Sequence, residues 1–98
     1  MKHFIIFVKY RVPFEKLGNN VAVHRTFLQS GYDDGMLLCS GPNEKKSAGV
    51  VVAKANDIEE LKGFFKNDPY ALKELADYEY LEFNPIKFQP FLQNWIES

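Results

Sequence analysis

Hydrophobic positions repeat with two different periods along the chain, and each change of period marks a boundary between predicted elements. Four segments rich in β-branched and aromatic residues predict strands, at residues 3–10, 36–41, 48–55 and 78–83. Two segments with apolar residues at three- and four-residue spacing predict helices, at residues 14–30 and 58–67. The chain therefore alternates as strand, helix, strand, strand, helix, strand.

This order predicts an α+β protein with the ferredoxin-like βαββαβ fold, in which a four-stranded antiparallel sheet carries both helices on one face. The 98 residues are too few for two hydrophobic cores, so we expect a single domain over residues 1–98. Residues 88–98 form a C-terminal amphipathic tail, because Phe91, Leu92 and Trp95 fall on one side of it.

The first strand is apolar on both of its sides. Ile5 and Phe7 alternate with Phe4, Ile6 and Val8, although a strand with one face in water normally alternates apolar and polar residues. The valine run of residues 48–55 has the same character. The sheet face without helices should therefore pack on something, and the simplest partner is the same face of a second copy, which predicts a homodimer.

Composition narrows the functional classes. The net charge is −1 with both signs interspersed, so no basic surface indicates nucleic-acid binding. Cys39 is the only cysteine, and the two histidines lack acidic residues at ligand spacing, so neither a disulfide nor a metal site is expected. The sequence has no glycine-rich phosphate loop, so no cofactor is expected. The apolar start of the chain is too short for a membrane span and has no cleavage site, which predicts a cytoplasmic protein.

Two polar residues interrupt the predicted apolar stripes. His24 lies among Val21 and Leu28 on the first helix, and Asp68 extends the stripe of Phe64 and Phe65 on the second. A lone buried histidine is commonly a hydrogen-bonded core residue. An aspartate followed by Pro69 suits the N-cap of a helix over residues 69–76. Either residue taken alone is thus explained without any catalytic role.

Taken together, the two interruptions predict a contact between His24 and Asp68. Both helices cover the same sheet face, and a buried carboxylate needs a hydrogen-bond donor. The aspartate would fix the tautomer of the imidazole and leave its other nitrogen free to move a proton. We expect Asp68 to cap the following helix with one oxygen and to hold His24 with the other.

Further candidates each have a structural alternative. Ser40 and the backbone of Gly41 are candidates to hold a substrate oxygen, or they simply end a strand before a hairpin. Arg25 is a candidate to bind a carboxylate, or it lies on a solvated helix face. Tyr70 and Tyr78 are candidate hydrogen-bond donors, with Tyr70 donating to substrate, or they belong to the core. His3 is expected on the surface of the first strand.

Several short motifs in a fixed order resemble the YCII-related (YciI-like) domain family over residues 3 to about 88. These are H-x-x-F-L at residues 24–28, S-G-P-N at 40–43, a valine strand opened by Gly49, D-P-Y at 68–70, and the aromatic–acidic strand 77–83. The resemblance implies a dimeric α/β barrel. It also implies that His24 and Asp68 are the suspected active-site pair, with Ser40 and Gly41 beside the pocket.

The wider barrel superfamily includes a dehydrochlorinase and muconolactone isomerase. The resemblance thus implies a cofactor-independent enzyme of the lyase or isomerase type acting on a small organic molecule. The alternatives are a non-catalytic small-ligand-binding or accessory module and an oxygen- or haem-using barrel enzyme. An arginine expected one helical turn before the histidine is replaced by Asn20 and Val21. Arg25 is then the candidate to bind an anionic group.

Overall fold

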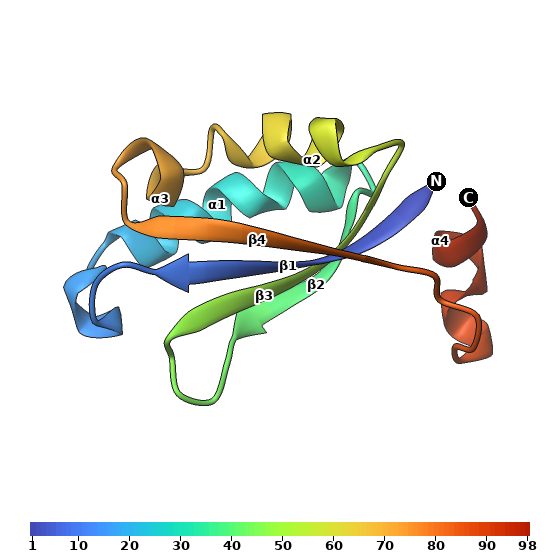
Figure 1. The fold of residues 1–98 in the computed structure, drawn as a ribbon, viewed down its shortest axis with the longest axis horizontal. Helices are drawn as coiled ribbons and strands as arrows, with labels where there is room; N and C mark the ends of the chain where they lie inside the picture. The colour runs from blue at the N-terminus through green and yellow to red at the C-terminus, as the bar shows by residue number, and fades with distance from the viewer.

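The computed structural model describes residues 1–98 and shows one antiparallel sheet with the longer helices on one side (Figure 1). The principal elements are β1 (Lys2–Tyr10), α1 (Asn20–Asp33), β2 (Leu37–Pro42), β3 (Ala48–Ala55), α2 (Ile58–Phe65) and β4 (Ala76–Phe83). Four shorter helices are η1 (Phe14–Lys16), α3 (Pro69–Leu72), η2 (Pro90–Leu92) and α4 (Gln93–Glu97).

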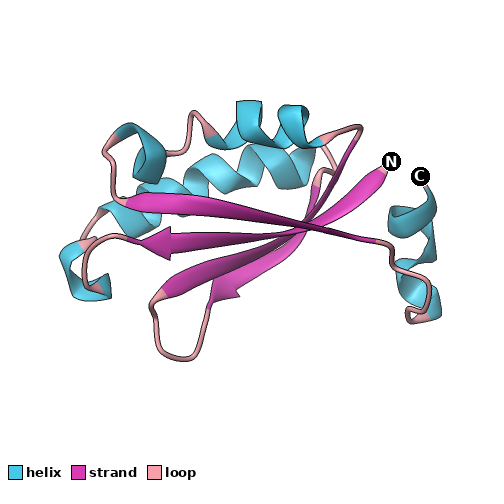
Figure 2. Ribbon diagram, in the orientation of Figure 1, coloured by secondary structure: helices cyan, strands magenta, loops and turns pink.

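The strands lie in the order β2-β3-β1-β4, and every neighbouring pair is antiparallel. Strand β1 is therefore central, and the β2–β3 hairpin and β4 flank it (Figure 2). This is the predicted ferredoxin-like arrangement, so the predicted fold class is confirmed. None of the helices is long and apolar enough to cross a membrane.

The core lies between the sheet and the helices. Phe4, Ile6 and Val8 point toward the helices from β1 and are fully buried. Leu61 and Phe65 meet them from α2, where they are one helical turn apart. Burial of each such side chain stabilises the folded state by roughly 1.5–3 kcal/mol relative to exposure, so this layer supplies most of the hydrophobic stabilisation of the fold.

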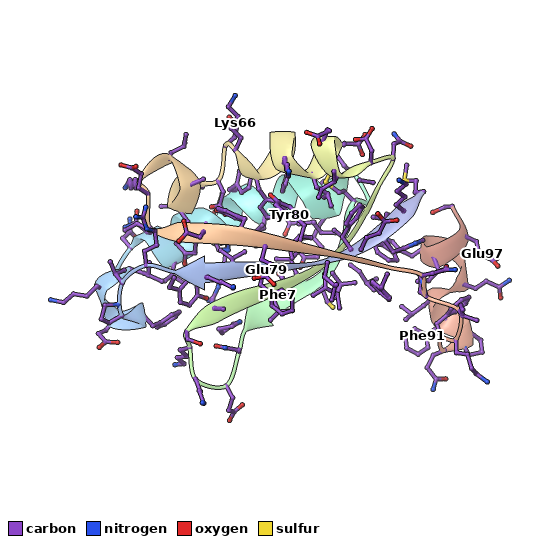
Figure 3. All side chains as sticks on the ribbon, in the orientation of Figure 1. Phe7, Lys66, Glu79, Tyr80, Phe91 and Glu97 are labelled. Atoms are coloured by element: carbon purple, nitrogen blue, oxygen red, sulfur yellow. The ribbon has the colours of Figure 1, made fainter.

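The opposite sheet face has helical cover only at its end, where α4 contacts His3 and Lys54. Ile5 and Phe7 are only half-buried there, and Leu81 on β4 is 50% exposed. Figure 3 labels Phe7 and Glu79 on this side of the sheet and Tyr80 on the helix-covered side, as the strand alternation requires. We call this surface the open face. Its apolar residues match the two-sided pattern in the sequence.

The first predicted helix is interrupted. Residues 14–30 were expected to be continuous, but η1 ends at Lys16 and α1 begins only at Asn20. Gly18 between them has φ +55°, a left-handed conformation that glycine adopts without steric cost. The buried side chain of Leu17 keeps the break anchored to the core. The period of apolar residues continues through the break, so the pattern concealed it.

The predicted helix over residues 69–76 is much shorter than expected. Helix α3 ends at Leu72, and Glu74 has φ +55°, which turns the chain out of the helix. The amide of Leu75 then donates to the carbonyl of Tyr70 at 2.7 Å, and β4 begins at Ala76, two residues earlier than expected. The prediction for this segment was wrong in length and correct in its starting residue.

The tail packs against the end of the sheet, beside the N-terminus (Figure 1). Trp95 Nε1 donates to the carbonyl of Gly35 at 2.9 Å, and His3 Nε2 donates to the carbonyl of Ile96 at 2.9 Å. His3 is therefore buried, and its predicted place on the strand surface was wrong because the tail covers it. Phe91, on the same predicted apolar side of the tail as Trp95, is 82% exposed.

Candidate active site

His24 and Asp68 are in hydrogen-bond contact. Nδ1 of His24, on α1, lies 2.8 Å from Oδ1 of Asp68, which is the residue before α3. Asp68 is fully buried, and the His24 side chain is 12% exposed. The two residues come from segments 44 positions apart, and they meet because α1 and α3 pack side by side over the sheet.

Local sequence fixes the position of Asp68. Helix α2 ends at Phe65, and Asp68 adopts an extended backbone conformation (φ −62°, ψ 132°), which the following proline favours. Its Oδ1 accepts the backbone N–H of Tyr70 at 3.1 Å, and Pro69 occupies the first helical position. Asp68 is thus the N-cap of α3, as the sequence indicated.

The division of labour between the two carboxylate oxygens differs from the prediction. Oδ1 receives both the capping N–H of Tyr70 and the contact from His24. Oδ2 accepts the hydroxyl of Tyr78, on β4, at 2.6 Å. The expectation of one oxygen for the cap and one for the histidine was wrong, because Tyr78 occupies the second oxygen. Three donors therefore surround a carboxylate that no solvent reaches.

These contacts define which nitrogen of His24 is free. An ionised carboxylate only accepts hydrogen bonds, so Nδ1 must carry the proton that it shares with Asp68. Nε2 of His24 has no hydrogen-bond partner. Every buried side-chain nitrogen or oxygen in the chain does have a partner, so Nε2 is not buried. Nε2 is therefore accessible, and His24 lines a cavity. Its unshared electron pair is available to a bound molecule.

Tyr70 supports the imidazole from one side. Its ring stacks on that of His24 with centroids 4.1 Å apart and planes 9° apart, and Tyr70 itself is 1% exposed. Burial raises the pKa of the Tyr70 phenol to about 12, and nearby Tyr10 and Asp68 add to this rise. The phenol is thus a neutral hydrogen-bond donor at physiological pH. Tyr70 was predicted as a substrate-binding residue, and it lines the cavity.

The cavity has a volume of about 240 Å³ and lies between α1, α3 and the β1–β3–β2 part of the sheet. All six residues singled out from the sequence are near it. Five line it directly: His24, Arg25, Ser40, Gly41 and Tyr70. Asp68 lies behind His24. Apolar side chains such as Val8, Val21 and Leu28 make up much of the remaining wall.

Ser40 and Gly41 lie on β2, an edge strand of the sheet. The hydroxyl of Ser40 is 2.6 Å from that of Tyr32 on α1, and this contact joins the two walls of the cavity. Ser40 and Gly41 are both exposed, so they lie at the mouth of the cavity. A ligand oxygen at this position can reach a hydroxyl that already has one hydrogen-bond partner.

Arg25 places a positive charge at the same cavity. None of the three ion pairs in the chain involves it. Its guanidinium lies close enough to the Tyr10 and Tyr70 phenols to oppose the rise in their pKa that burial causes. The charge is therefore directed toward phenol oxygens on the cavity wall, where it would favour a ligand anion as well.

Sequence reasoning named Tyr78 as a hydrogen-bond donor but missed its acceptor, and it missed Tyr10. Strand alternation in residues 76–83 placed Tyr78 on one face of β4 but did not reveal the carboxylate beneath it. Tyr10 lines the cavity where Gly49 faces it, and a Cβ on Gly49 would lie 3.4 Å from the Tyr10 hydroxyl. The unusual glycine in a valine strand was the available signal for this close approach.

The chain belongs to the YCII-related domain family, since the family model matches residues 1–84. A similar solved structure is 5-chloro-2-hydroxyhydroquinone dehydrochlorinase (TftG) from Burkholderia phenoliruptrix AC1100, in complex with 2,5-dihydroxybenzoquinone. It has a TM-score of 0.66 and 18% sequence identity, and the match covers 89% of this chain and 93% of that one. At this identity the likeness shows a shared fold. No curated protein matches in sequence.

Proposed function

We propose that this protein is a cofactor-independent enzyme of the lyase or isomerase type that moves protons on a small organic molecule. The observation that carries the proposal is the state of His24. Its Nδ1 is bound to a buried carboxylate, and its Nε2 is free at a cavity. This arrangement suits a general acid/base, with Asp68 orienting the ring and stabilising the imidazolium when it forms.

The chemistry needs only proton transfer. Nε2 of His24 takes a proton from a substrate hydroxyl, and the electron pair left on oxygen forms a carbonyl. The resulting imidazolium returns a proton to a substrate carbon, which completes an isomerisation with no net change in atoms or electrons. If the substrate also bears a halide, loss of a second proton together with that halide is a net elimination of hydrogen halide, which is a lyase reaction.

The cavity favours a six-membered ring with ionisable oxygens. An apolar cavity of about 150 Å³ holds benzene, so about 240 Å³ leaves room for ring substituents. Arg25 would attract an oxyanion, and Ser40 with the Gly41 N–H would position an oxygen at the mouth. The ligand of the structurally similar dehydrochlorinase, 2,5-dihydroxybenzoquinone, is a molecule of this kind and supports the proposal.

The proposal includes a homodimer that joins the open faces of two sheets. Support comes from the half-buried Ile5 and Phe7 and the exposed Leu81 and Phe83 on that face. Unpaired apolar surfaces of this kind mark protein interfaces. The cavity lies on the helix side of the sheet, so each copy would keep its own site.

The competing proposal is a small-ligand-binding module in which His24 and Asp68 have a structural role. The observation in its favour is that Asp68 is fully satisfied by three donors and caps α3, a combination that stabilises the fold without any reaction. The two proposals differ in what removal of the His24 imidazole does.

A screen of hydroxylated and halogenated six-membered rings tests the choice, with 5-chloro-2-hydroxyhydroquinone included. Halide release and ultraviolet spectra are followed anaerobically for the wild-type protein and for His24→Asn. The control is Thr26→Ala, an exposed position on the same helix. The enzyme proposal predicts turnover by wild type and control, and a rate about 10²–10⁴-fold lower for His24→Asn.

Two results would contradict the enzyme proposal. One is equal turnover by His24→Asn and wild type, which would remove the imidazole from the mechanism. The other is binding of the rings with no turnover of any of them, which would favour the ligand-binding module. Thermal unfolding of each variant accompanies the screen, so that a loss of rate is assigned to chemistry only in a folded protein.

A further inference from the structure

The hydroxyl of Tyr78 is the sole partner of one oxygen of the Asp68 carboxylate. We propose that Tyr78 is a positioning residue, which fixes the carboxylate in the orientation that receives the His24 Nδ1 proton on its other oxygen. This inference rests on the proposed acid–base function and adds to it a third member on a separate element of the fold.

The geometry shows why a third member matters. Asp68 lies between two short helices, and its Oδ1 is shared by two donors, the backbone N–H of Tyr70 and His24 Nδ1. Donors on one oxygen alone leave the carboxylate free to turn about its terminal torsion, which has a broad energy minimum. The 2.6 Å contact from Tyr78 to Oδ2 removes that freedom.

Tyr78 is anchored to the sheet. It lies on β4 and pairs with Val8 of the central strand β1. Its ring also packs on that of Phe65, with centroids 5.5 Å apart. The Tyr78 hydroxyl therefore fixes Asp68 relative to the sheet, whereas the contacts from His24 and Tyr70 fix it relative to the helices. A catalytic group held by two independent elements keeps its geometry during turnover.

The hydroxyl keeps its proton under all ordinary conditions. Burial raises the pKa of Tyr78 well above its usual value, and the hydrogen bond to Asp68 and the charge of that carboxylate raise it further. The other ionisable groups near this site are the phenols of Tyr10, Tyr70 and Tyr80, and Arg25 at the cavity. Tyr78 is thus a permanent donor to Asp68.

The test compares Tyr78→Phe with Tyr80→Phe. Tyr80 is two residues further along β4 on the same face, and its hydroxyl makes no hydrogen bond to Asp68. Ring-nitrogen NMR of ¹⁵N-histidine-labelled protein reports where the His24 proton lies. The wild type and Tyr80→Phe should show one form with the proton on Nδ1. Tyr78→Phe should show a mixture with the Nε2-protonated form, and its Nδ1 proton should exchange faster with water.

A kinetic readout follows on any substrate that the wild type converts. Tyr78→Phe should lower kcat about 10- to 100-fold, the effect typical of residues that orient metal-binding side chains, and leave KM nearly unchanged. A purely structural role would lower the thermal stability without changing kcat of the folded fraction. A single Nδ1-protonated form in Tyr78→Phe, with wild-type kcat, would overturn the inference.

If Tyr78→Phe does not fold, the wild-type protein supplies the second readout. The hydroxyl proton of Tyr78 should give a resonance protected from exchange with water, and that resonance should move in Asp68→Asn. A hydroxyl proton that exchanges as fast as that of exposed Tyr residues would contradict the inference. The NMR measurements need no substrate, so they remain decisive for Tyr78 even if the screen rules out an enzyme.

Discussion

Replacement of Asp68 by alanine should cost far more stability than the loss of a helix cap. Asp57 offers a matched comparison within the same chain. It caps α2 by accepting the Glu60 N–H at 2.9 Å, and it is exposed. Asp57→Ala should therefore lower the free energy of unfolding by about 1 kcal/mol, the usual cost of a lost N-cap.

The cost at Asp68 can be worked from its contacts. Loss of the Tyr70 cap accounts for about 1 kcal/mol. The hydrogen bonds from His24 and Tyr78 go to a charged group, and such bonds are worth about 1.5–3 kcal/mol each. Part of this is offset, because a buried carboxylate carries a desolvation penalty of several kcal/mol that alanine avoids. We expect a net loss of about 2–4 kcal/mol for Asp68→Ala.

Urea unfolding followed by circular dichroism measures both variants, and equal slopes against urea would show that both unfold as the wild type does. The reasoning is refuted if Asp68→Ala and Asp57→Ala lose the same free energy. That result would mean that Asp68 is only a cap, and that the His24 and Tyr78 contacts contribute nothing to the fold.

Three further outcomes follow from other parts of the molecule. Gly31→Ala places a Cβ 2.8 Å from Leu37, so it should lower the free energy of unfolding in urea by about 1–3 kcal/mol. Gly63→Ala meets nothing within 4 Å and should raise that free energy by about 0.5–1 kcal/mol. The reverse order of stabilities would contradict the packing. Burial raises the pKa of Tyr70 to about 12, against about 10 in the unfolded chain. The resulting contribution to stability should be fully present below about pH 10 and lost as the pH rises toward 12. Equal urea midpoints at about pH 9 and about pH 11.5 would refute this. Leu81→Asp on the open face should convert the proposed homodimer to a monomer in light scattering, and a wild-type monomer would refute the dimer.

The sequence predicted the order of elements and the pairing of His24 with Asp68, because both follow from periodicity. Apolar side chains at fixed spacing defined each buried face, and a polar residue on such a face needs a partner. Because both helices cover the same face of the sheet, His24 on one apolar stripe and Asp68 on the other were each other's predicted hydrogen-bond partner. Asp68 before Pro69 also identified the start of α3.

The details that the sequence did not reveal depend on three-dimensional contacts. The break at Gly18 leaves the apolar period intact, and the burial of His3 depends on a tail far along the chain. The hydroxyl of Tyr78 reaches Asp68 only once β4 lies beneath α3. Strand alternation gives the face of a tyrosine but not the atom that its hydroxyl meets, so the second carboxylate oxygen was assigned wrongly.

The central claim is that Nε2 of His24 exchanges protons with a molecule in the cavity. Deuterium uptake tests it directly, with 2,5-dihydroxybenzoquinone in heavy water and mass spectrometry of its ring positions. The claim predicts that the wild-type protein accelerates exchange at ring carbon, and that His24→Asn loses this acceleration about 10²–10⁴-fold while remaining folded. Equal exchange rates with the wild type and His24→Asn would contradict the claim.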